Sequence, residues 1–277
     1  MKKISIFAAF LLVATFALFS CQNDEAQIEE QAADQEKYPE ITKKLQEMHF
    51  NTDGLEKVDF QLPDGSFQEM FLVEGDMMFT TKQIENMKMG GDITTKQYRT
   101  NNLVSNGVIT IIGYTGGGGF GLSSKEQTAL QWAVNNYNRL NLDISFSLTY
   151  GTNYQSKDMV VYHNPNESGA GGSAGFPSNG NPNKFVQIYG LGGYSTNVNE
   201  HVITHEIGHS VGFRHTDWWS RQSCGQNSNE GTAGVGAVHI PGTPTGYDST
   251  SIMLACFSTN EDGEFNSNDI TALRYMY

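Results

Sequence analysis

The sequence predicts an α+β protein made of a main domain and a smaller module in front of it. Strand-like and helix-like patterns alternate up to about residue 215. Beyond that point the chain is rich in glycine, serine and proline and has weak periodicity, until a final helical pattern closes it. We place the small module at residues 35–96 and the main domain at residues 97–277.

Length and charge limit the classes of function that need consideration. The chain has 277 residues, of which 38% are hydrophobic, enough for one good-sized domain and a smaller one. Its net charge of -13 argues against binding to nucleic acid, because the phosphates would be repelled.

The N-terminus has the pattern of a targeting segment. Two lysines precede an apolar run over residues 4–19, too short for a typical membrane-spanning helix and typical of a signal peptide at residues 1–20. The run ends in "LFSC", which resembles a bacterial lipobox with cleavage before Cys21 and a lipid on its sulfur. Residues 21–34 are polar and acidic and predict a solvated tether. The alternative is an ordinary signal peptide that is cut nearby.

The small module is predicted to contain two helices and a hairpin. Apolar residues recur at helical spacing in residues 35–50, with Pro39 in the first turn. Two strand patterns flank a turn at Pro63-Asp64-Gly65. The stretch "TTKQIENMKM" predicts a short second helix.

The main domain begins with a β-branched strand, "GVITIIGY", followed by a glycine-rich loop and a helix. Ser123 and Glu126 predict a capping box at the start of that helix. The strands "DISFSLTY", "DMVVYH" and "KFVQIY" follow, with a glycine-rich stretch before the last of them. We expect a second long helix to begin near Asn197, with Glu200 completing its capping box, and a final helix to be capped by Ser267 or Asn268.

The stretch "HEIGHSVGFRH" predicts a metal site. His205 and His209 are four residues apart, so they lie one turn apart on one helix face. Glu206 points elsewhere but can reach a water on the same ion, as a general base would. Gly212 can end the helix and allow the chain to bring His215 up as a third ligand.

Two other interpretations of the glycines and histidines are disfavoured. Structural zinc sites are closed by four protein ligands, usually with cysteine, whereas this motif offers three histidines and a neighbouring carboxylate. Gly116, Gly118 and Gly121 satisfy a dinucleotide-binding pattern. Four consecutive glycines meet that pattern easily by chance, and nicotinamide cofactors are scarce outside the cell.

The motif resembles that of the metzincin clan of zinc metallopeptidases, and its form "HEIGHSVGFRHTD" is most similar to the dual-action HEIGH metallopeptidase family. The resemblance covers about residues 98–277. It implies a twisted mixed sheet with two long helices, a loop-rich lower lobe with a C-terminal helix, and Zn²⁺ bound by the three histidines. It also implies that Ser251-Ile252-Met253 is a Met-turn, with Met253 as a floor beneath the site.

The resemblance has one departure. Some metzincins carry a zinc-reaching tyrosine two places after that methionine, where this chain has Ala255. We therefore expect three histidines and a water on the ion.

The small module contains a second resemblance. "FLVEGDMMF" is similar to the F-x-G-D segment of astacin-type propeptides, although Val73 replaces the phenylalanine. In that family the aspartate takes the open zinc position, which implies that Asp76 keeps the enzyme latent until the segment before about Tyr98 is cut away. The alternative is that Glu74-Gly75-Asp76 is only a turn in a small folded module.

The remaining cysteines, Cys224 and Cys256, are even in number, and an exported protein folds in an oxidising compartment. We expect a disulfide between them, the alternative being two buried thiols.

Together these patterns predict an exported, lipid-anchored zinc endopeptidase on the outer membrane or cell surface, or released from it. Its partners would be a protein or peptide substrate and the membrane, and we expect a monomer. The substrate would lie along an exposed sheet edge near residues 173–176. The alternatives are a zinc-containing surface protein that binds without hydrolysis and a zinc hydrolase that cleaves other linkages.

Overall fold

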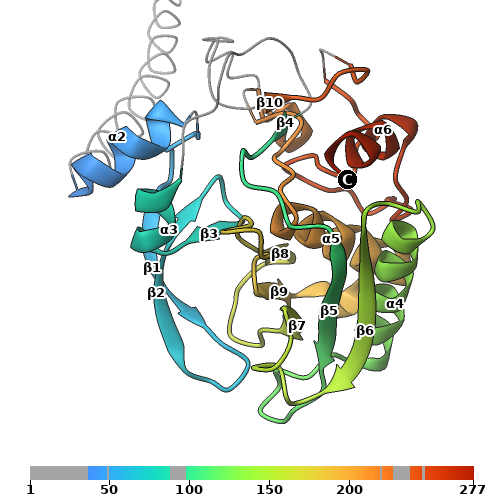
Figure 1. The fold of residues 1–277 in the computed structure, drawn as a ribbon. Coiled ribbons are helices and arrows are strands. Elements are labelled where there is room, and N and C mark those ends of the chain that lie inside the picture. Colours follow the sequence, from blue (N-terminus) through green and yellow to red (C-terminus); the bar gives the residue numbers. More distant parts are fainter. Residues whose placement is uncertain (1–36, 49, 88–97, 219, 227–237, 245–246) are drawn as a thin grey trace, which may run out of the picture.

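The computed structural model describes residues 37–48, 50–87, 98–218, 220–226, 238–244 and 247–277. In these residues the chain forms a mixed five-stranded sheet with helices on one face, and a three-stranded sheet with two short helices beside it (Figure 1). The predicted α+β class with a mixed sheet is therefore confirmed.

The five-stranded sheet has the order β6-β5-β7-β9-β8. Four strands are parallel, and β8, at one edge, runs antiparallel to β9. The strands are β5 (Gly107–Tyr114), β6 (Ile144–Gly151), β7 (Met159–His163), β8 (Gly171–Ser173) and β9 (Phe185–Tyr189). The predicted strands β5, β6, β7 and β9 are confirmed, whereas β8 lies in the stretch whose glycines gave no strand signal.

Two long helices, α4 (Ser124–Asn138) and α5 (Thr196–Ser210), pack against each other on one face of this sheet. The capping box of α4 is present as predicted, with the Ser123 side chain accepting from the Glu126 N–H. The Tyr137 hydroxyl donates to the Thr204 carbonyl at 2.8 Å and ties α4 to α5. The main hydrophobic core fills the space between the sheet and these helices. The C-terminal helix α6 (Ser267–Met276) contributes buried side chains to the same core.

The expected caps of two helices were wrong. Helix α5 begins at Thr196, next to the predicted Asn197, but its cap is Ser195, whose side chain accepts from the Val198 N–H. The Glu200 side chain points inward and accepts from Asn136 at 2.8 Å, so it is not free to cap. Helix α6 is capped by Asn266, with Asp269 completing the capping box, and not by the two residues after Asn266.

The N-terminal module, residues 38–87, contains a three-stranded antiparallel sheet of order β1-β2-β3. Its elements are α2 (Pro39–Glu47), β1 (Glu56–Gln61), β2 (Phe67–Val73), β3 (Met77–Phe79) and α3 (Thr81–Asn86), which confirms the predicted hairpin and helices. Phe60 and Met70 pack on Ile112, Val160 and Tyr162, which face away from α4 and α5. The module therefore covers the second face of the five-stranded sheet.

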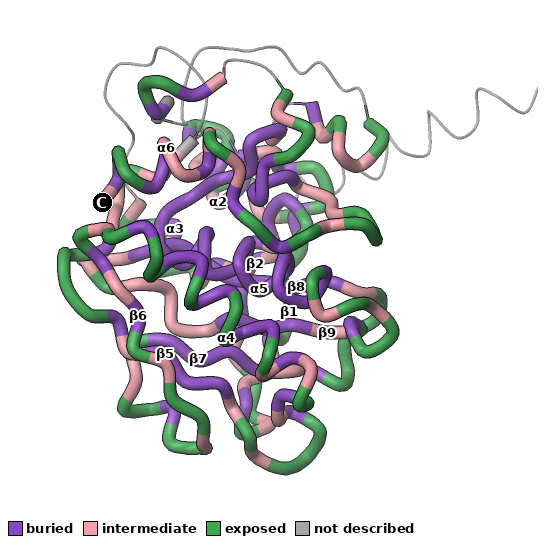
Figure 2. Tube along the Cα trace, turned by 90° about the vertical axis from the view of Figure 1, so that its right-hand side faces the viewer, coloured by how far each residue is buried: buried purple, intermediate pink, exposed green. Residues whose placement is uncertain are grey.

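The remaining short elements are β4 (Tyr98–Arg99), β10 (Val238–His239) and the 3₁₀ turns η1 (Leu191–Gly193) and η2 (Gln222–Cys224). Strands β4 and β10 pair with each other. Figure 2 shows that α5 and the centre of the large sheet are the most continuously buried parts of the trace. None of the helices in the described part of the chain is long and apolar enough to span a membrane. The predicted signal peptide, Cys21 and the tether lie outside the described residues.

Candidate metal centre

Helix α5 and the turn after it bring the three histidines together. His205 and His209 lie on one face of α5, and both are buried. The helix ends at Ser210, and Gly212 has φ of +113°, a conformation that favours glycine. The Phe213 N–H then donates to the Gly208 carbonyl at 2.9 Å, so the chain turns back and places His215 beside the other two.

Hydrogen bonds orient each imidazole from behind. The Nδ1 atoms of His205 and His209 lie 2.8 and 2.9 Å from the carbonyl oxygens of Ile252 and Phe213, so each Nδ1 carries the proton. This leaves both Nε2 atoms free to bind a metal, the usual arrangement of metal-binding histidines. The Nε2 atoms of His209 and His215 are 3.1 Å apart.

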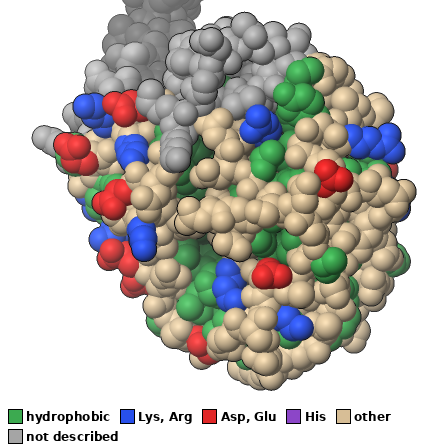
Figure 3. Space-filling view, viewed as in Figure 1, with side chains coloured by type: hydrophobic (Ala, Val, Ile, Leu, Met, Phe, Trp, Pro, Cys, Tyr) green, Lys and Arg blue, Asp and Glu red, His purple; other side chains and the backbone are tan. Residues whose placement is uncertain are grey.

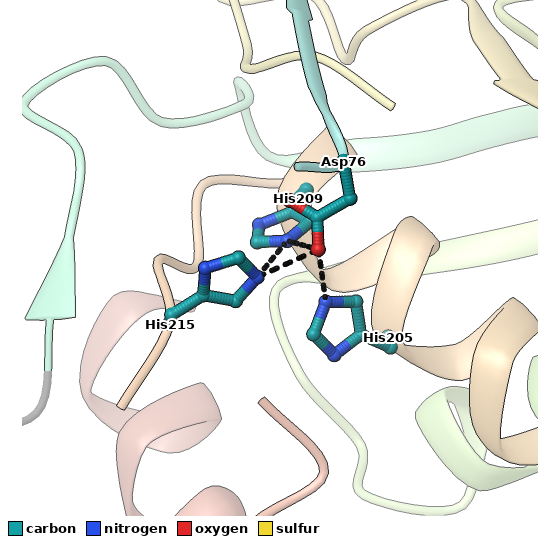
Figure 4. A group of neighbouring side chains, drawn as sticks. All are labelled: Asp76, His205, His209 and His215. Carbon is teal, nitrogen blue, oxygen red and sulfur yellow. Dashed lines mark hydrogen bonds and ion pairs between the residues drawn. The ribbon is translucent and has the colours of Figure 1, made fainter. Parts of the chain in front are cut away.

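Asp76, from the turn between β2 and β3, is the fourth member of the cluster (Figure 4). Its Oδ2 atom lies 2.9, 3.5 and 4.0 Å from the Nε2 atoms of His215, His205 and His209. The four ligand atoms all lie within 4.8 Å of one another. Zn–N and Zn–O bonds of about 2.0–2.1 Å would place tetrahedral neighbours roughly 3.3 Å apart, so these atoms fit around one zinc ion.

The charges in the cluster depend on one another. Burial alone would raise the pKa of Asp76, but the charge of His215 and hydrogen bonds from His205 and His215 outweigh it and lower that pKa. Burial alone would lower the pKa of His215, yet Asp76 and Glu74 raise it to about 9. Burial and the two neighbouring imidazoles lower the pKa of His209. In the metal-free protein, a proton on His215 therefore offsets the negative charge of Asp76. In the metal-bound protein, the metal cation would offset that charge.

Glu206 lies beside the cluster and is 2% exposed. Its Oε2 atom has no hydrogen-bond partner among the described residues. Burial, and then the charge of Asp76, raise its pKa well above the usual range. Gly172 of β8 lies against its side chain, so the edge strand and the carboxyl are in direct contact.

The family model of the dual-action HEIGH metallo-peptidases matches residues 71–277, well over half of the chain. This chain belongs to that family. No curated protein sequence matches it.

Among solved structures, two of myroilysin are similar to this member of the HEIGH family. The first is 14% identical with a TM-score of 0.41, and covers 64% of this chain and 82% of its own. The second is 15% identical with a TM-score of 0.40, and covers 70% of this chain and 92% of its own.

The HEIGH family implies zinc, and the donor set fits it. Three imidazole nitrogens and a carboxylate oxygen are ligands that Zn²⁺ commonly takes in four-coordinate sites. Asp76 lies inside the stretch that matches the family model, since that stretch begins at residue 71. The chain is thus a metallopeptidase whose N-terminal module carries a carboxylate into the metal centre.

Met253, which the resemblance implied to be the methionine of a Met-turn, packs against α5 at Gly208. It is fully buried, and a methyl group on Gly208 would come within 2.6 Å of its sulfur. The absence of a side chain at Gly208 therefore allows Met253 to approach α5. Ser251 and Ile252 are fixed from below by Asp269, which accepts from the Ser251 hydroxyl at 2.8 Å and the Ile252 N–H at 3.0 Å.

The predicted disulfide is present. Cys224 and Cys256 are bonded and close a loop with a sequence separation of 32. Beside them, Ala255 donates its N–H to Asp217 at 2.9 Å. Ala255 also lines a cavity of 390 Å³ next to the metal centre, with Asp76, Glu206 and Tyr189 among the other lining residues.

The N-terminal module also covers the sheet edge that was predicted to hold the substrate. The Met78 N–H donates to the Ala174 carbonyl at 2.8 Å, and the Ala174 N–H donates to the Asp76 carbonyl at 3.0 Å. Met77 and Ala174 form a parallel bridge. The edge near residues 173–176 is therefore paired with the segment that carries Asp76.

Sequence reasoning missed two polar partners at this site. Glu74 was expected only as part of a turn, but its carboxylate is buried against Arg214 and His215. Arg214 is the residue directly before the third histidine and is 1% exposed. The sequence did contain a signal for this contact. Arg214 is a charged residue inside the metal motif, and Glu74 stands two places before the candidate Asp76.

Two further histidines of the described residues, His201 and His163, lie outside the cluster. His201, one turn before His205, is buried at 4% exposure, and burial followed by the charge of His205 lowers its pKa to about 3. His163 has its Nδ1 atom 2.9 Å from Oε1 of Glu126. On the face shown in Figure 3 no histidine side chain is visible, which agrees with the burial of the metal centre.

Proposed function

We propose that this chain is a zinc-dependent endopeptidase that is made in a latent form. The observation that carries this proposal is the convergence of His205, His209 and His215 around one point, with Glu206 beside it and Asp76 in the fourth position. A site that only bound zinc would have no need of the Glu206 carboxyl.

Each residue then has a defined part in peptide hydrolysis. His205, His209 and His215 would hold Zn²⁺, which when bound supplies a Lewis acid and lowers the pKa of water from 15.7 to about 7. Glu206 accepts a proton from the attacking water and later donates it to the leaving amine. Since the pair Gly172 and Glu206 is in contact, a substrate paired along β8 would have its backbone close to that carboxyl.

Asp76 supports latency in two ways. Its carboxylate takes the position that the attacking water would need, and its segment pairs with Ala174 on the edge where a substrate would lie. We propose that residues up to about Tyr98 act as a pro-domain, and that activity requires this segment to leave the cleft.

Export completes the proposal. A signal peptide at residues 1–20, lipid on Cys21 and a location on the outer membrane or cell surface follow from the N-terminal sequence pattern alone. Incorporation of radioactive palmitate in wild type, and its loss in Cys21→Ala, would test the anchor.

The function is tested by comparing full-length wild type with Asp76→Ala on an unfolded protein and on a short fluorogenic peptide. We expect slow cleavage by wild type, faster cleavage by the variant, and loss of both with a zinc chelator. Equal, chelator-insensitive rates would contradict the proposal. Zinc binding without cleavage would favour a binding protein, and cleavage of other linkages alone would favour another class of hydrolase.

A further inference from the structure

A second carboxylate beside the metal centre, that of Glu74, has partners for both of its oxygens. Glu74 lies two residues before Asp76 and is 3% exposed. Its Oε1 atom accepts from Arg214 Nη2 at 3.2 Å and from the Asn51 N–H at 3.0 Å. Its Oε2 atom lies 3.3 Å from Nδ1 of His215. Both oxygens of this side chain are thus bonded inside the protein.

Arg214 is built into the site that receives this carboxylate. Its guanidinium lies 4.1 Å from the centre of the Phe50 ring and 5.4 Å from that of Trp218. It also donates to the Met48 carbonyl at 3.2 Å. Stacking and hydrogen bonds hold a planar cation in one orientation, which suits recognition of a carboxylate.

A second arginine binds the backbone of the same residue. Arg221 Nη1 donates to the Glu74 carbonyl at 3.1 Å. A methyl group on Gly75 would lie 3.7 Å from Arg221 Nη2, so this guanidinium runs along the turn that leads to Asp76. The two arginines and His215 all belong to the main domain, whereas the group they bind belongs to the N-terminal module.

The backbone of Glu74 has a conformation that is costly for a glutamate. Its φ is +54°, a region that glycine and asparagine adopt readily and glutamate rarely does. The conformational cost persists only where surrounding contacts outweigh it. The presence of a glutamate at this turn is therefore better explained by the contacts of its carboxylate than by the backbone preference of glutamate.

We propose that Arg214 forms a carboxylate-binding site next to the metal centre, with Glu74 as its occupant and with Arg221 binding the backbone carbonyl of the same residue. This site is the second contact, after that of Asp76 with the histidines, that keeps the protein in the latent form. It holds the segment in the cleft and, through Gly75, positions Asp76 at the metal. It also supplies the group that orients His215 from behind. The part of the inference that concerns latency rests on the proposed function, whereas carboxylate binding by Arg214 does not.

The first test measures access to the metal in zinc-loaded, full-length protein, with acetohydroxamate as the probe and calorimetry as the readout. We expect weak binding by wild type, strong binding by Asp76→Ala, and at least tenfold tighter binding than wild type by Glu74→Gln and Glu74→Gly. Glu69→Gln, an exposed position on β2, is the matched control and should behave as wild type. If Glu74→Gln bound acetohydroxamate as weakly as wild type, the proposed role of Glu74 in latency would be wrong.

The second test needs no zinc and separates the carboxylate site from the proposed function. Glu74→Gly keeps a residue that favours positive φ and removes the atoms that propionate can replace. In metal-free, full-length Glu74→Gly, propionate should raise the midpoint of thermal unfolding in a saturable way, and propionamide should not. Wild type should respond to neither. An equal response of the variant to propionate and propionamide would overturn the inference, even if the hydroxamate experiment confirmed the metal site.

Discussion

Gly172 and Glu206 are in direct contact across the space between the edge strand and α5. A methyl group built on Gly172 would lie 2.6 Å from Cγ of Glu206 and 2.8 Å from its Oε1 atom. The edge strand therefore contains a glycine at the position where the candidate base needs room. It also follows that the position of the Glu206 carboxyl depends on β8.

Gly172→Ala should therefore displace Glu206 and leave the zinc ligands in place. In an Asp76→Ala background we expect hydrolysis to fall by about 10²-fold, because a displacement of about 1 Å in a catalytic group can have that effect. Zinc content should be unchanged. Gly171→Ala is the control, since a methyl group there would first meet Tyr189 at an ordinary 3.4 Å. Equal losses in the two variants would show that the edge strand, and not Glu206, had been disturbed.

His215→Ala should weaken zinc binding strongly, because one of the three histidine ligands is removed. The loss should exceed the roughly 10–100-fold effect of removing a group that merely orients a ligand. Metal analysis of the full-length variant after dialysis checks this prediction. Full zinc occupancy would remove His215 from the site and leave a two-histidine motif of another clan.

Metal-free protein should lose stability in alkali. The pKa of His215 is raised from 6.5 to about 9, so the associated stabilisation is fully present below about pH 6.5 and is lost as pH rises through about 9. The raised pKa of Glu206 acts in the same direction. Urea unfolding at pH 6.5 and 9.5 measures the change.

The control for this pH dependence is metal-free Asp76→Asn, in which His215 lacks its main charged partner. We expect the decline between the two pH values to be smaller in this variant. A wild-type protein that is equally stable at both values, or more stable at pH 9.5, would contradict the assigned ion pair.

Local sequence patterns predicted the parts of the fold that depend on near neighbours. The capping box of Ser123 and Glu126 was found because both partners lie within one turn. The cap of α5 was predicted wrongly because Glu200, which the sequence offered for a capping box, accepts instead from Asn136 of the other helix. Strand β8 was missed because its glycines carry no strand signal, although Gly172 is needed for contact with Glu206.

The residues of the candidate site also divide into those that local sequence patterns predicted and those that depend on distant contacts. His205, Glu206 and His209 follow from helical spacing, and Gly212 indicated the return of the chain to His215. The contact between Glu74 and Arg214 joins residues 140 positions apart, and each looks in the sequence like a solvated surface charge. The N-terminal module was predicted as a separate unit, and neither its packing on the second face of the sheet nor its pairing with Ala174 had a local signal.

The most direct test of the central claim is hydrolysis by Glu206→Gln, measured in full-length Asp76→Ala protein with one zinc bound per chain. Glu206 is not one of the residues whose ligand atoms converge at the metal centre, so the double variant should keep its zinc. Its rate on an unfolded protein should be at least about 10²-fold below that of Asp76→Ala, since general acid–base catalysis typically contributes about 10²–10⁴-fold. A double variant that holds zinc and cleaves as fast as Asp76→Ala would contradict the assignment of Glu206 as the base, and with it the proposed mechanism.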